Sequence, residues 1–272
     1  MKPVLTIAGS DCSGGAGIQA DLKTMTVHGV YGMSAITALT AQNTGGVSGI
    51  QTISPSFLEE QLERIFEDIP PIAVKIGMIG NSELTTVIAN IIKKYKPPFV
   101  VVDPVMVATS GANLSTNPAV ETLINELLPL ATLITPNLYE LGQLITSIDS
   151  SFNTSSITTS ESMLEIAKAL VHYTNANVLA KGGHLTDSAS DLLYCTDGTY
   201  HWFHGKRFAN PNTHGTGCTL SSAIASHLAL GYSLKESVQR SKDYVAGAIA
   251  ANMKLGHGHG PLNHCYSIQT RI

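Results

Sequence analysis

The stretch VLTIAGSDCSGGAGIQADLKTMTVH, residues 4–28, holds the unit from which the predicted fold is built. Residues 4–8 are an apolar, β-branched run of strand length, and residues 16–28 have the length and spacing of a helix. The segment between them is rich in glycine, serine and aspartate, as turns are. A strand, a glycine-rich loop and a helix in this order predict the first unit of a parallel sheet.

The same alternation of strand and helix continues for most of the chain. Further strands are predicted at residues 34–41, 73–78, 99–105, 132–135 and 178–180. Helices are predicted at residues 57–69, 84–95, 119–128 and 163–173, the first with Ser54 as its cap and Pro55 at its first position. We therefore predict an α/β fold with a mostly parallel central sheet and helices on both faces.

Two segments depart from this alternation. Residues 192–195 and 200–203 flank Thr196-Asp197-Gly198-Thr199, where Asp-Gly indicates a hairpin, so a small antiparallel piece should edge the sheet. Two helices, at 218–230 and 234–254, follow it. Residues 146–162 are rich in serine and threonine, and we interpret them as a surface loop between two helices. The chain, residues 1–272, is thus predicted to form a single domain.

The composition excludes several classes of function. The 272 residues carry 16 Lys and Arg against 20 Asp and Glu, a net charge of −4, whereas nucleic-acid binding needs clustered basic residues. The apolar start, residues 4–8, is too short for a signal peptide or a membrane span. The four cysteines form no Cys-x-x-Cys pair, as is typical of reduced thiols. We expect a cytoplasmic protein that binds neither nucleic acid nor membranes.

Three familiar motifs are incomplete or absent. Residues 15–20, Gly-Ala-Gly-Ile-Gln-Ala, match a dinucleotide-binding loop, but no Asp or Glu occurs between Leu22 and Leu58, where the ribose-binding acid should lie. Neither a G-x-x-x-x-G-K-[ST] loop nor H-E-x-x-H occurs. His257-Gly258-His259, with His264 and Cys265, could bind a transition metal. We interpret residues 256–261 instead as a glycine-rich turn after the last helix.

The clearest functional motif precedes the first C-terminal helix and reads Asn212-Thr213-His214-Gly215-Thr216-Gly217-Cys218-Thr219. Small residues let the backbone approach a ligand, and free N–H groups at a helix start attract anions. Cys218 would lie at that helix start, so we predict a lowered thiol pKa. The alternative is a loop that only caps the helix.

Further polar groups come where predicted strands end. Asp103 lies near the end of one strand and Lys181 directly follows another. Asn137 and Glu140 follow the strand at 132–135, and such a pair suits a hydrated Mg²⁺ near phosphates. Because ligands of open α/β sheets bind at the carboxyl ends of the strands, these groups are expected to share one edge. Each could otherwise be a capping or solvated residue.

Two polar side chains stand among apolar or small neighbours. Asp21 lies in the first predicted helix, and Gln42 follows the strand at 34–41. A buried glutamine offers one acceptor and two donors, which complement the edge of an aminopyrimidine. Asp11, Ser13 and the glycines of the first loop are expected at the same edge of the sheet.

Together these motifs resemble the ribokinase-like superfamily, and within it the hydroxymethylpyrimidine/phosphomethylpyrimidine kinases of thiamin biosynthesis. The matching stretches are residues 8–24, 41–44, 103–107, 135–140, 181–184, 212–219 and 256–261, in family order over nearly the whole chain. The resemblance implies a three-layer ribokinase-like fold. It also implies ATP-dependent phosphorylation of 4-amino-5-hydroxymethyl-2-methylpyrimidine and then of its monophosphate, with ATP and Mg²⁺ as cofactors and a homodimer as the assembly.

The resemblance also implies roles for individual residues. The residues that bind the pyrimidine are Gly9, Asp21, Gln42, Met78 and Val105. The residues at the nucleotide are Lys181, Asn137 and Thr213, and those that support the metal are Glu140 and Asp103. The catalytic group consists of an anion hole, Gly215, Thr216 and Gly217, and of Cys218, which stands where many sugar kinases of the superfamily carry an aspartate base.

Two alternatives stay open on the same fold. In kinases that prefer pyridoxal the position of Gln42 tends to be apolar, so we expect pyridoxal or pyridoxine phosphorylation only as a secondary activity. A ligand-binding protein without turnover would have no reason to keep Glu140, Lys181 and Cys218 together. Residues 107–113 are small, polar and glycine-containing, and are predicted to form a mobile flap over the substrate.

Overall fold

A computed structural model describes residues 1–106, 117–152, 157, 159–183, 190–205, 210 and 212–268. Its strands form one sheet in the order β3-β2-β1-β4-β5-β6-β7-β8-β9. The strands from β2 through β1 and β4 to β7 pair in parallel with their neighbours. The sheet ends in antiparallel strands, β3 at one edge and β8 and β9 at the other. The strands are β1 (Pro3–Asp11), β2 (Tyr31–Asn43), β3 (Gly46–Thr52), β4 (Ala73–Ile76), β5 (Phe99–Val102), β6 (Leu133–Ile134), β7 (Asn177–Ala180), β8 (Asp191–Tyr194) and β9 (Tyr200–Phe203).

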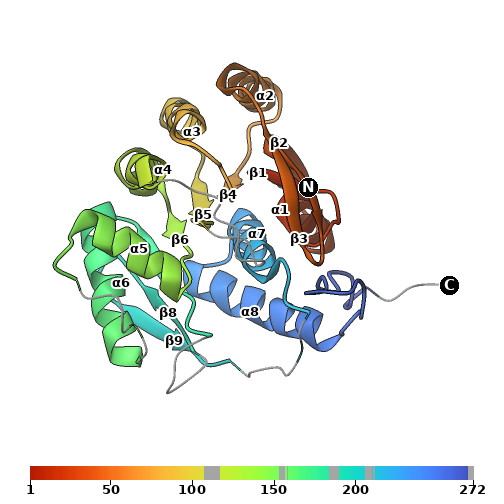
Figure 1. The fold of residues 1–272 in the computed structure, drawn as a ribbon. Coiled ribbons are helices and arrows are strands. Elements are labelled where there is room, and N and C mark those ends of the chain that lie inside the picture. The colour runs from red at the N-terminus through yellow and green to blue at the C-terminus, as the bar shows by residue number, and fades with distance from the viewer. Residues whose placement is uncertain are drawn as a thin grey trace.

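Helices cover both faces of the sheet, so the predicted fold class is confirmed (Figure 1). One face carries α1 (Gly17–Val27), α7 (Thr216–Ala229) and α8 (Leu234–Ala250). The other carries α2 (Pro55–Asp68), α3 (Ser82–Tyr95), α4 (Asn117–Thr122), α5 (Leu138–Ile148) and α6 (Ser160–Thr174).

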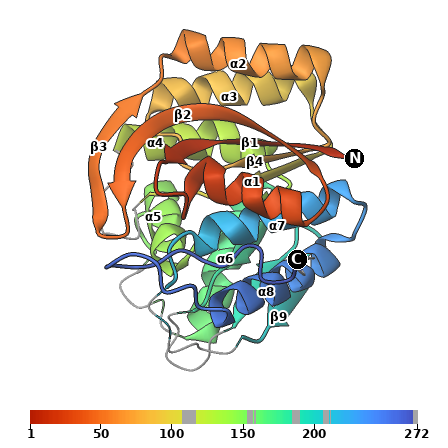
Figure 2. The ribbon, with the colours of Figure 1, turned by 90° about the vertical axis from the view of Figure 1, so that its right-hand side faces the viewer.

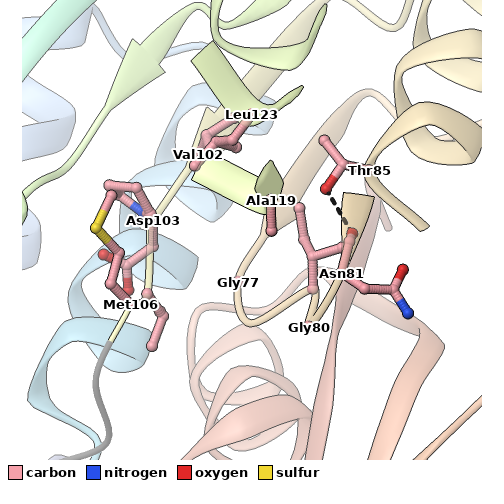
Figure 3. Close-up of a pocket in the computed structure, with 12 residues that line it drawn as sticks. Gly77, Gly80, Asn81, Thr85, Val102, Asp103, Met106, Ala119 and Leu123 are labelled. Atoms are coloured by element: carbon pink, nitrogen blue, oxygen red, sulfur yellow. Dashed lines mark hydrogen bonds between the residues drawn. The ribbon is translucent and has the colours of Figure 1, made fainter. Parts of the chain in front are cut away.

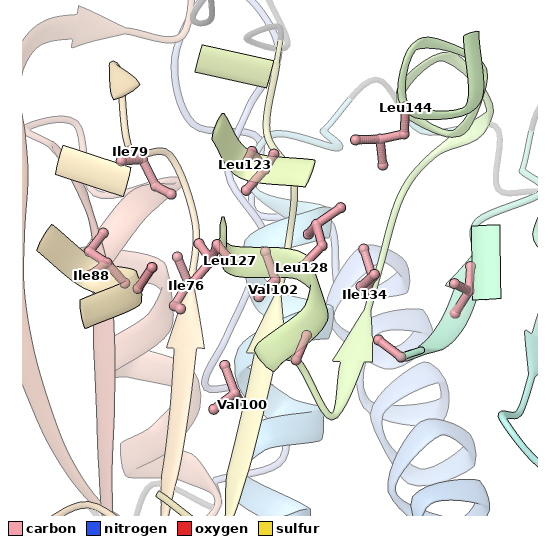
Figure 4. Close-up of a cluster of buried hydrophobic side chains, with 14 of the residues drawn as sticks. Ile76, Ile79, Ile88, Val100, Val102, Leu123, Leu127, Leu128, Ile134 and Leu144 are labelled. Carbon is pink, nitrogen blue, oxygen red and sulfur yellow. The ribbon is translucent and has the colours of Figure 1, made fainter. Parts of the chain in front are cut away.

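The apolar core is split by the sheet into two clusters. In β5, Val100 and Val102 contribute to the cluster under α2 to α6, drawn in Figure 4, whereas Val101 contributes to the cluster under α7 and α8. This alternation is the period of a strand buried on both faces. In β4 the same alternation gives Val74 and Ile76 to the first cluster and directs Lys75 toward the α7 side.

Two elements were not predicted from the sequence. β3 is an edge strand whose residues are mostly exposed and include glycine, serine and glutamine, so it lacks the apolar pattern of a buried strand. α5 begins where we interpreted Asn137 and Glu140 as a ligand motif. Asn137 caps that helix, and Glu140 closes the reciprocal capping box.

The helix predicted at residues 119–128 is not a single α-helix. It begins as α4 and widens into a π-turn at Leu123–Leu127, and a 3₁₀ turn at Leu128–Leu130 ends it. Pro129 explains the ending, because proline has no N–H to donate to the turn before it.

Four further expectations concern the hairpin, a loop, membrane spans and the cysteines. The Asp-Gly hairpin joins β8 to β9 with Gly198 at a positive φ of 84°. The loop predicted at 146–162 separates α5 from α6, although α5 extends to Ile148 and α6 begins at Ser160. No described helix is long and apolar enough to cross a membrane, and all four cysteines are free. The predicted flap, 107–113, lies outside the described residues.

Candidate active site

The carboxyl ends of the parallel strands and the start of α7 gather most of the predicted polar residues. Asp103 follows β5 and Lys181 follows β7, and the Lys181 ammonium lies 2.9 Å from the Asp103 carboxylate. A Cβ atom on Gly217, near the start of α7, would lie 3.3 Å from Asp103 and 3.4 Å from Lys181. The ion pair therefore lies beside Gly217, at the same edge of the sheet, as the strand-end rule predicts.

Glu140 is the third charged member of this group. Its carboxylate lies 3.9 Å from the Lys181 ammonium and accepts a hydrogen bond from the Asn137 N–H at 2.8 Å. Burial raises the pKa of Glu140 to about 7, although Lys181 opposes the shift. Burial also acts to raise the pKa of Asp103, but Lys181 and Lys75 hold it below its usual value. Glu140 therefore takes up a proton near neutral pH, while Asp103 stays ionised.

A second ion pair lies beneath the first, and our sequence analysis missed its cation. Lys75 in β4 is fully buried and lies 2.8 Å from Asp21 of α1, which also accepts a hydrogen bond from Thr6 at 2.6 Å. Burial raises the pKa of Asp21, and both Asp21 and Asp103 raise the pKa of Lys75 against the effect of burial. A lysine in the middle of a four-residue apolar strand was the signal, because a buried charge needs a partner.

Cys218 lies between the two pairs, and the expectation of a lowered thiol pKa is wrong. Burial raises the pKa of Cys218 to about 11, and the negative charges of Asp21 and Asp103 act in the same direction. The Gly17 N–H and the ammonium of Lys75 oppose this shift without reversing it. The thiol is therefore protonated at neutral pH.

The loop before α7 makes a tight turn at Gly215. Gly215 has a positive φ of 82°, and a Cβ there would lie 1.9 Å from the Gly15 carbonyl oxygen, so only glycine fits. Thr216 donates to the Thr213 carbonyl at 2.7 Å, which turns the chain into the helix. The side chain of Thr213, predicted at the nucleotide, is exposed.

Gln42 belongs to a separate polar group at the end of β2. One end of its amide lies 3.2 Å from His214 Nε2, and the other lies 3.1 Å from Thr40 Oγ1. His214 Nε2 also lies 2.9 Å from the Asp11 carboxylate. Burial acts to raise the pKa of Asp11, but hydrogen bonds from His214 and Ser13 hold it well below its usual range. Our sequence analysis assigned no role to His214 within its motif.

The other residues predicted to bind the substrate are Gly9, Met78, Val105 and Asp21. A Cβ on Gly9 would lie 2.4 Å from the Met78 side chain, so the missing side chain makes room for Met78. Val105 and Asp103 line a pocket between the ends of β4 and β5, shown in Figure 3 with Asn81 and Met106. Asp21 is fully buried, with one carboxylate oxygen that has no hydrogen-bond partner among the described residues.

The described residues contain no group of three or more metal-ligating side chains. The candidate at His257, His259, His264 and Cys265 is thus not a metal centre within this part of the chain. Gly256 has a positive φ of 81°, and the N–H groups of His257 and Gly258 donate to the Thr44 hydroxyl at 3.2 Å. The segment is the predicted turn, and it is packed on the end of β2 (Figure 2).

Solved structures with this fold are ribokinase-like kinases, as the resemblance implied. A phosphomethylpyrimidine kinase from Clostridium difficile superposes with a TM-score of 0.80 at 44% identity, over 92% of this chain and 100% of that one. A pyridoxal kinase from Staphylococcus aureus in complex with ADP gives a TM-score of 0.88 at 35% identity, over 99% and 96% of the two chains.

The family model of phosphomethylpyrimidine kinase matches residues 11–263, and the chain belongs to this family. A hydroxymethylpyrimidine/phosphomethylpyrimidine kinase from Haemophilus influenzae is 44% identical over 97% of both chains. A thiamine biosynthesis bifunctional protein from Geobacter sulfurreducens is 50% identical over 96% of this chain, which spans 52% of that longer protein.

Proposed function

We propose that this protein phosphorylates the hydroxymethyl group of 4-amino-5-hydroxymethyl-2-methylpyrimidine with ATP, and then the monophosphate to the diphosphate, in thiamine biosynthesis. The observation that supports this best is the position of the Lys181–Asp103 pair beside Gly217, near the start of α7. A lysine cation beside helix N–H groups suits a transferring phosphoryl group, whose charge lies on its outer oxygens. The names of the relatives support the pyrimidine as the acceptor.

In this proposal Lys181 and the N–H groups of Gly215, Gly217 and Cys218 bind the phosphates of the nucleotide, while the Thr216 N–H donates to the Thr213 carbonyl. Asn137 and Thr213 lie at the outer side of the nucleotide in this proposal. Gly9, Gln42, Met78 and Val105 contact the pyrimidine, and Asp21 supports the floor of its site through Lys75. Cys218 orients the hydroxymethyl group. Because its thiol is protonated at neutral pH, it is a weak base, and phosphoryl transfer depends on positioning and charge more than on a strong base.

The acidic residues fit a hydrated Mg²⁺ that arrives with the nucleotide. Asp103 is already engaged by Lys181 and by the Thr135 hydroxyl at 3.0 Å, so it would act through water. In Glu140, the oxygen Oε2 both accepts from the Asn137 N–H and lies 3.9 Å from the Lys181 ammonium, which leaves Oε1 as the oxygen that would face the ion. Mg²⁺ typically uses one or two carboxylates together with phosphates and waters. The ion would neutralise charge on the phosphates.

Location and assembly complete the proposal. Four free cysteines without a disulfide suit a reducing compartment, so we propose the cytoplasm. A homodimer stays a prediction from the family resemblance.

Pyridoxal phosphorylation is the second candidate, and the pyridoxal kinase with a TM-score of 0.88 favours it. The two candidates are separated by ADP release with the pyrimidine alcohol, its monophosphate, pyridoxal and ribose in parallel. We expect the highest kcat/KM with the pyrimidine alcohol, a second phosphorylation of its monophosphate, weaker turnover of pyridoxal and none of ribose. A higher kcat/KM for pyridoxal would make it the main substrate. No ADP release with any alcohol would indicate a binding protein.

A further inference from the structure

Two polar side chains from distant parts of the chain, Asp11 and Gln42, meet at His214. His214 Nε2 lies 2.9 Å from Asp11 Oδ2 and 3.2 Å from the Gln42 amide. At its other end, the Gln42 amide lies 3.1 Å from Thr40 Oγ1, which in turn lies 2.9 Å from the Ser10 carbonyl oxygen. Each contact is within hydrogen-bond distance. The chain of groups therefore constrains which atoms carry hydrogen.

The Asp11 end of this chain is fixed. The carboxylate is ionised, because its pKa lies well below the usual range, and an ionised carboxylate only accepts hydrogen bonds. Oδ2 also accepts from the N–H groups of Gly15 and Ala16, and Oδ1 accepts from Ser13. His214 Nε2 must therefore carry a hydrogen, whether the ring is neutral or protonated.

The Thr40 end is fixed in the same way. The Ser10 carbonyl only accepts, so the single hydroxyl hydrogen of Thr40 points to it, and Thr40 Oγ1 meets Gln42 as an acceptor. An amide nitrogen facing His214 would set two donors against each other, and an amide oxygen facing Thr40 would set two acceptors against each other. Half a turn of the amide exchanges these atoms in place: the nitrogen then donates to Thr40, and the oxygen shares the single Nε2 hydrogen of His214 with Asp11 as a bifurcated hydrogen bond.

We propose that His214, held by Asp11, is a positioning residue that fixes the Gln42 amide with its oxygen toward the imidazole and its nitrogen toward Thr40. In this orientation the amide has one oxygen lone pair and one N–H left for a ligand, in a set order. A 4-aminopyrimidine presents the matching order, an amino donor beside a ring-nitrogen acceptor. The 4-oxo analogue, with a carbonyl beside a ring N–H, presents the reverse. This inference rests on the proposed function.

The backbone holds His214 in place from two sides. A Cβ on Gly15 would lie 2.4 Å from His214 Cδ2, so the loop after β1 packs directly on the ring. The His214 N–H donates to the Gly260 carbonyl at 3.2 Å. The turn that contains Gly260 also holds Thr44, two residues after Gln42, through its backbone N–H groups. One turn therefore fixes both partners of the contact, which gives residues 256–261 a role.

The test compares kcat/KM for the 4-amino alcohol and its 4-oxo analogue. His214→Phe keeps a flat ring but removes the donor, so we expect the preference for the amino substrate to fall about 10-fold or more, mainly through KM. His214→Gln supplies a donor again and should restore part of the preference. His172→Phe, the same change at an exposed position of α6, should leave the preference unchanged.

Thr40→Val is the second variant, since it releases the other end of the amide without changing His214, and it should lower the preference as well. Calorimetric binding of both pyrimidines measures the preference even where turnover is low. An unchanged preference in both His214→Phe and Thr40→Val would overturn the role of His214, as would a parent protein that does not distinguish the two pyrimidines. A parent protein that phosphorylates neither pyrimidine would overturn the proposed function itself.

Discussion

The two lysine–aspartate pairs have nearly the same geometry but different surroundings. The Nζ–Oδ distance is 2.8 Å for Lys75–Asp21 and 2.9 Å for Lys181–Asp103. Both side chains of the first pair are 0% exposed, whereas Lys181 is 18% exposed at the mouth of the site. The first pair forms the floor of the site, and the second faces the space where we propose that phosphates bind.

The aspartate pKa values diverge accordingly. Burial raises the pKa of Asp21, whose cation is Lys75, while Lys181 and Lys75 together hold the pKa of Asp103 below its usual value despite burial. An ion-pair distance therefore does not reveal what a pair does. The number of neighbouring charges and the access of water separate a pair that stabilises the fold from a pair that binds a ligand.

The largest expected effect comes from breaking the buried pair. Lys75→Met leaves the Asp21 carboxylate buried without its cation, so the free energy of unfolding should fall by about 3–5 kcal/mol, measured in urea. The double variant Lys75→Met/Asp21→Leu removes both charges and should recover most of the loss. If the single variant loses less than about 1 kcal/mol, the pair does not stabilise the fold.

Breaking the Lys181–Asp103 pair should reduce turnover more than it reduces stability. Lys181→Met leaves the buried Asp103 carboxylate without its nearest cation, but Lys75 still acts on it and water can reach the Lys181 side, so the free energy of unfolding should fall by about 1–3 kcal/mol, less than in Lys75→Met. ADP release should fall about 100-fold or more, because the charge on the transferred phosphoryl group loses its partner. Lys168→Met, at an exposed position of α6, is the control. Normal turnover in a strongly destabilised Lys181→Met protein would make this pair structural as well.

The smallest expected effect concerns two buried histidines, His28 and His227, which have no carboxylate partner as the two lysines do. The rings of His28 and His227 lie 4.6 Å apart, and both nitrogens of His227 have no hydrogen-bond partner among the described residues. Burial lowers the pKa of both side chains to about 4, the reverse of the direction for Lys75.

Because the unfolded chain binds protons first, these histidines contribute stability above pH 6.5, which is lost as the pH falls toward 4. His227→Phe should reduce the loss of unfolding free energy between pH 7 and pH 4.5 by about 1–3 kcal/mol, measured by urea titration at both pH values. His172→Phe, at an exposed position, is the control. An equal acid sensitivity in His227→Phe and the parent would contradict this reading.

The sequence was informative where local chemistry decides the structure. Strand ends located Asp103 and Lys181, because parallel strands bring their carboxyl ends to one edge whatever their order. The role of Lys75 depends on which helix covers β4, and that of His214 depends on a turn from the end of the chain, so neither could be predicted locally. The wrong pKa direction for Cys218 has the same origin, since burial by other elements outweighs the helix start.

The turn at residues 256–261 also bears on how the protein folds. Its contact between His257 and Thr44 spans 213 positions, and such non-local contacts form slowly because a long loop must close first. β1 and β2 can pair early, since their pairing partners are close in sequence. The end of β2 also pairs locally with β3, at Gln42 and Val47. We therefore expect the contact between His214 and Gln42 to be among the last to form, so that selectivity for the acceptor appears only when folding is complete.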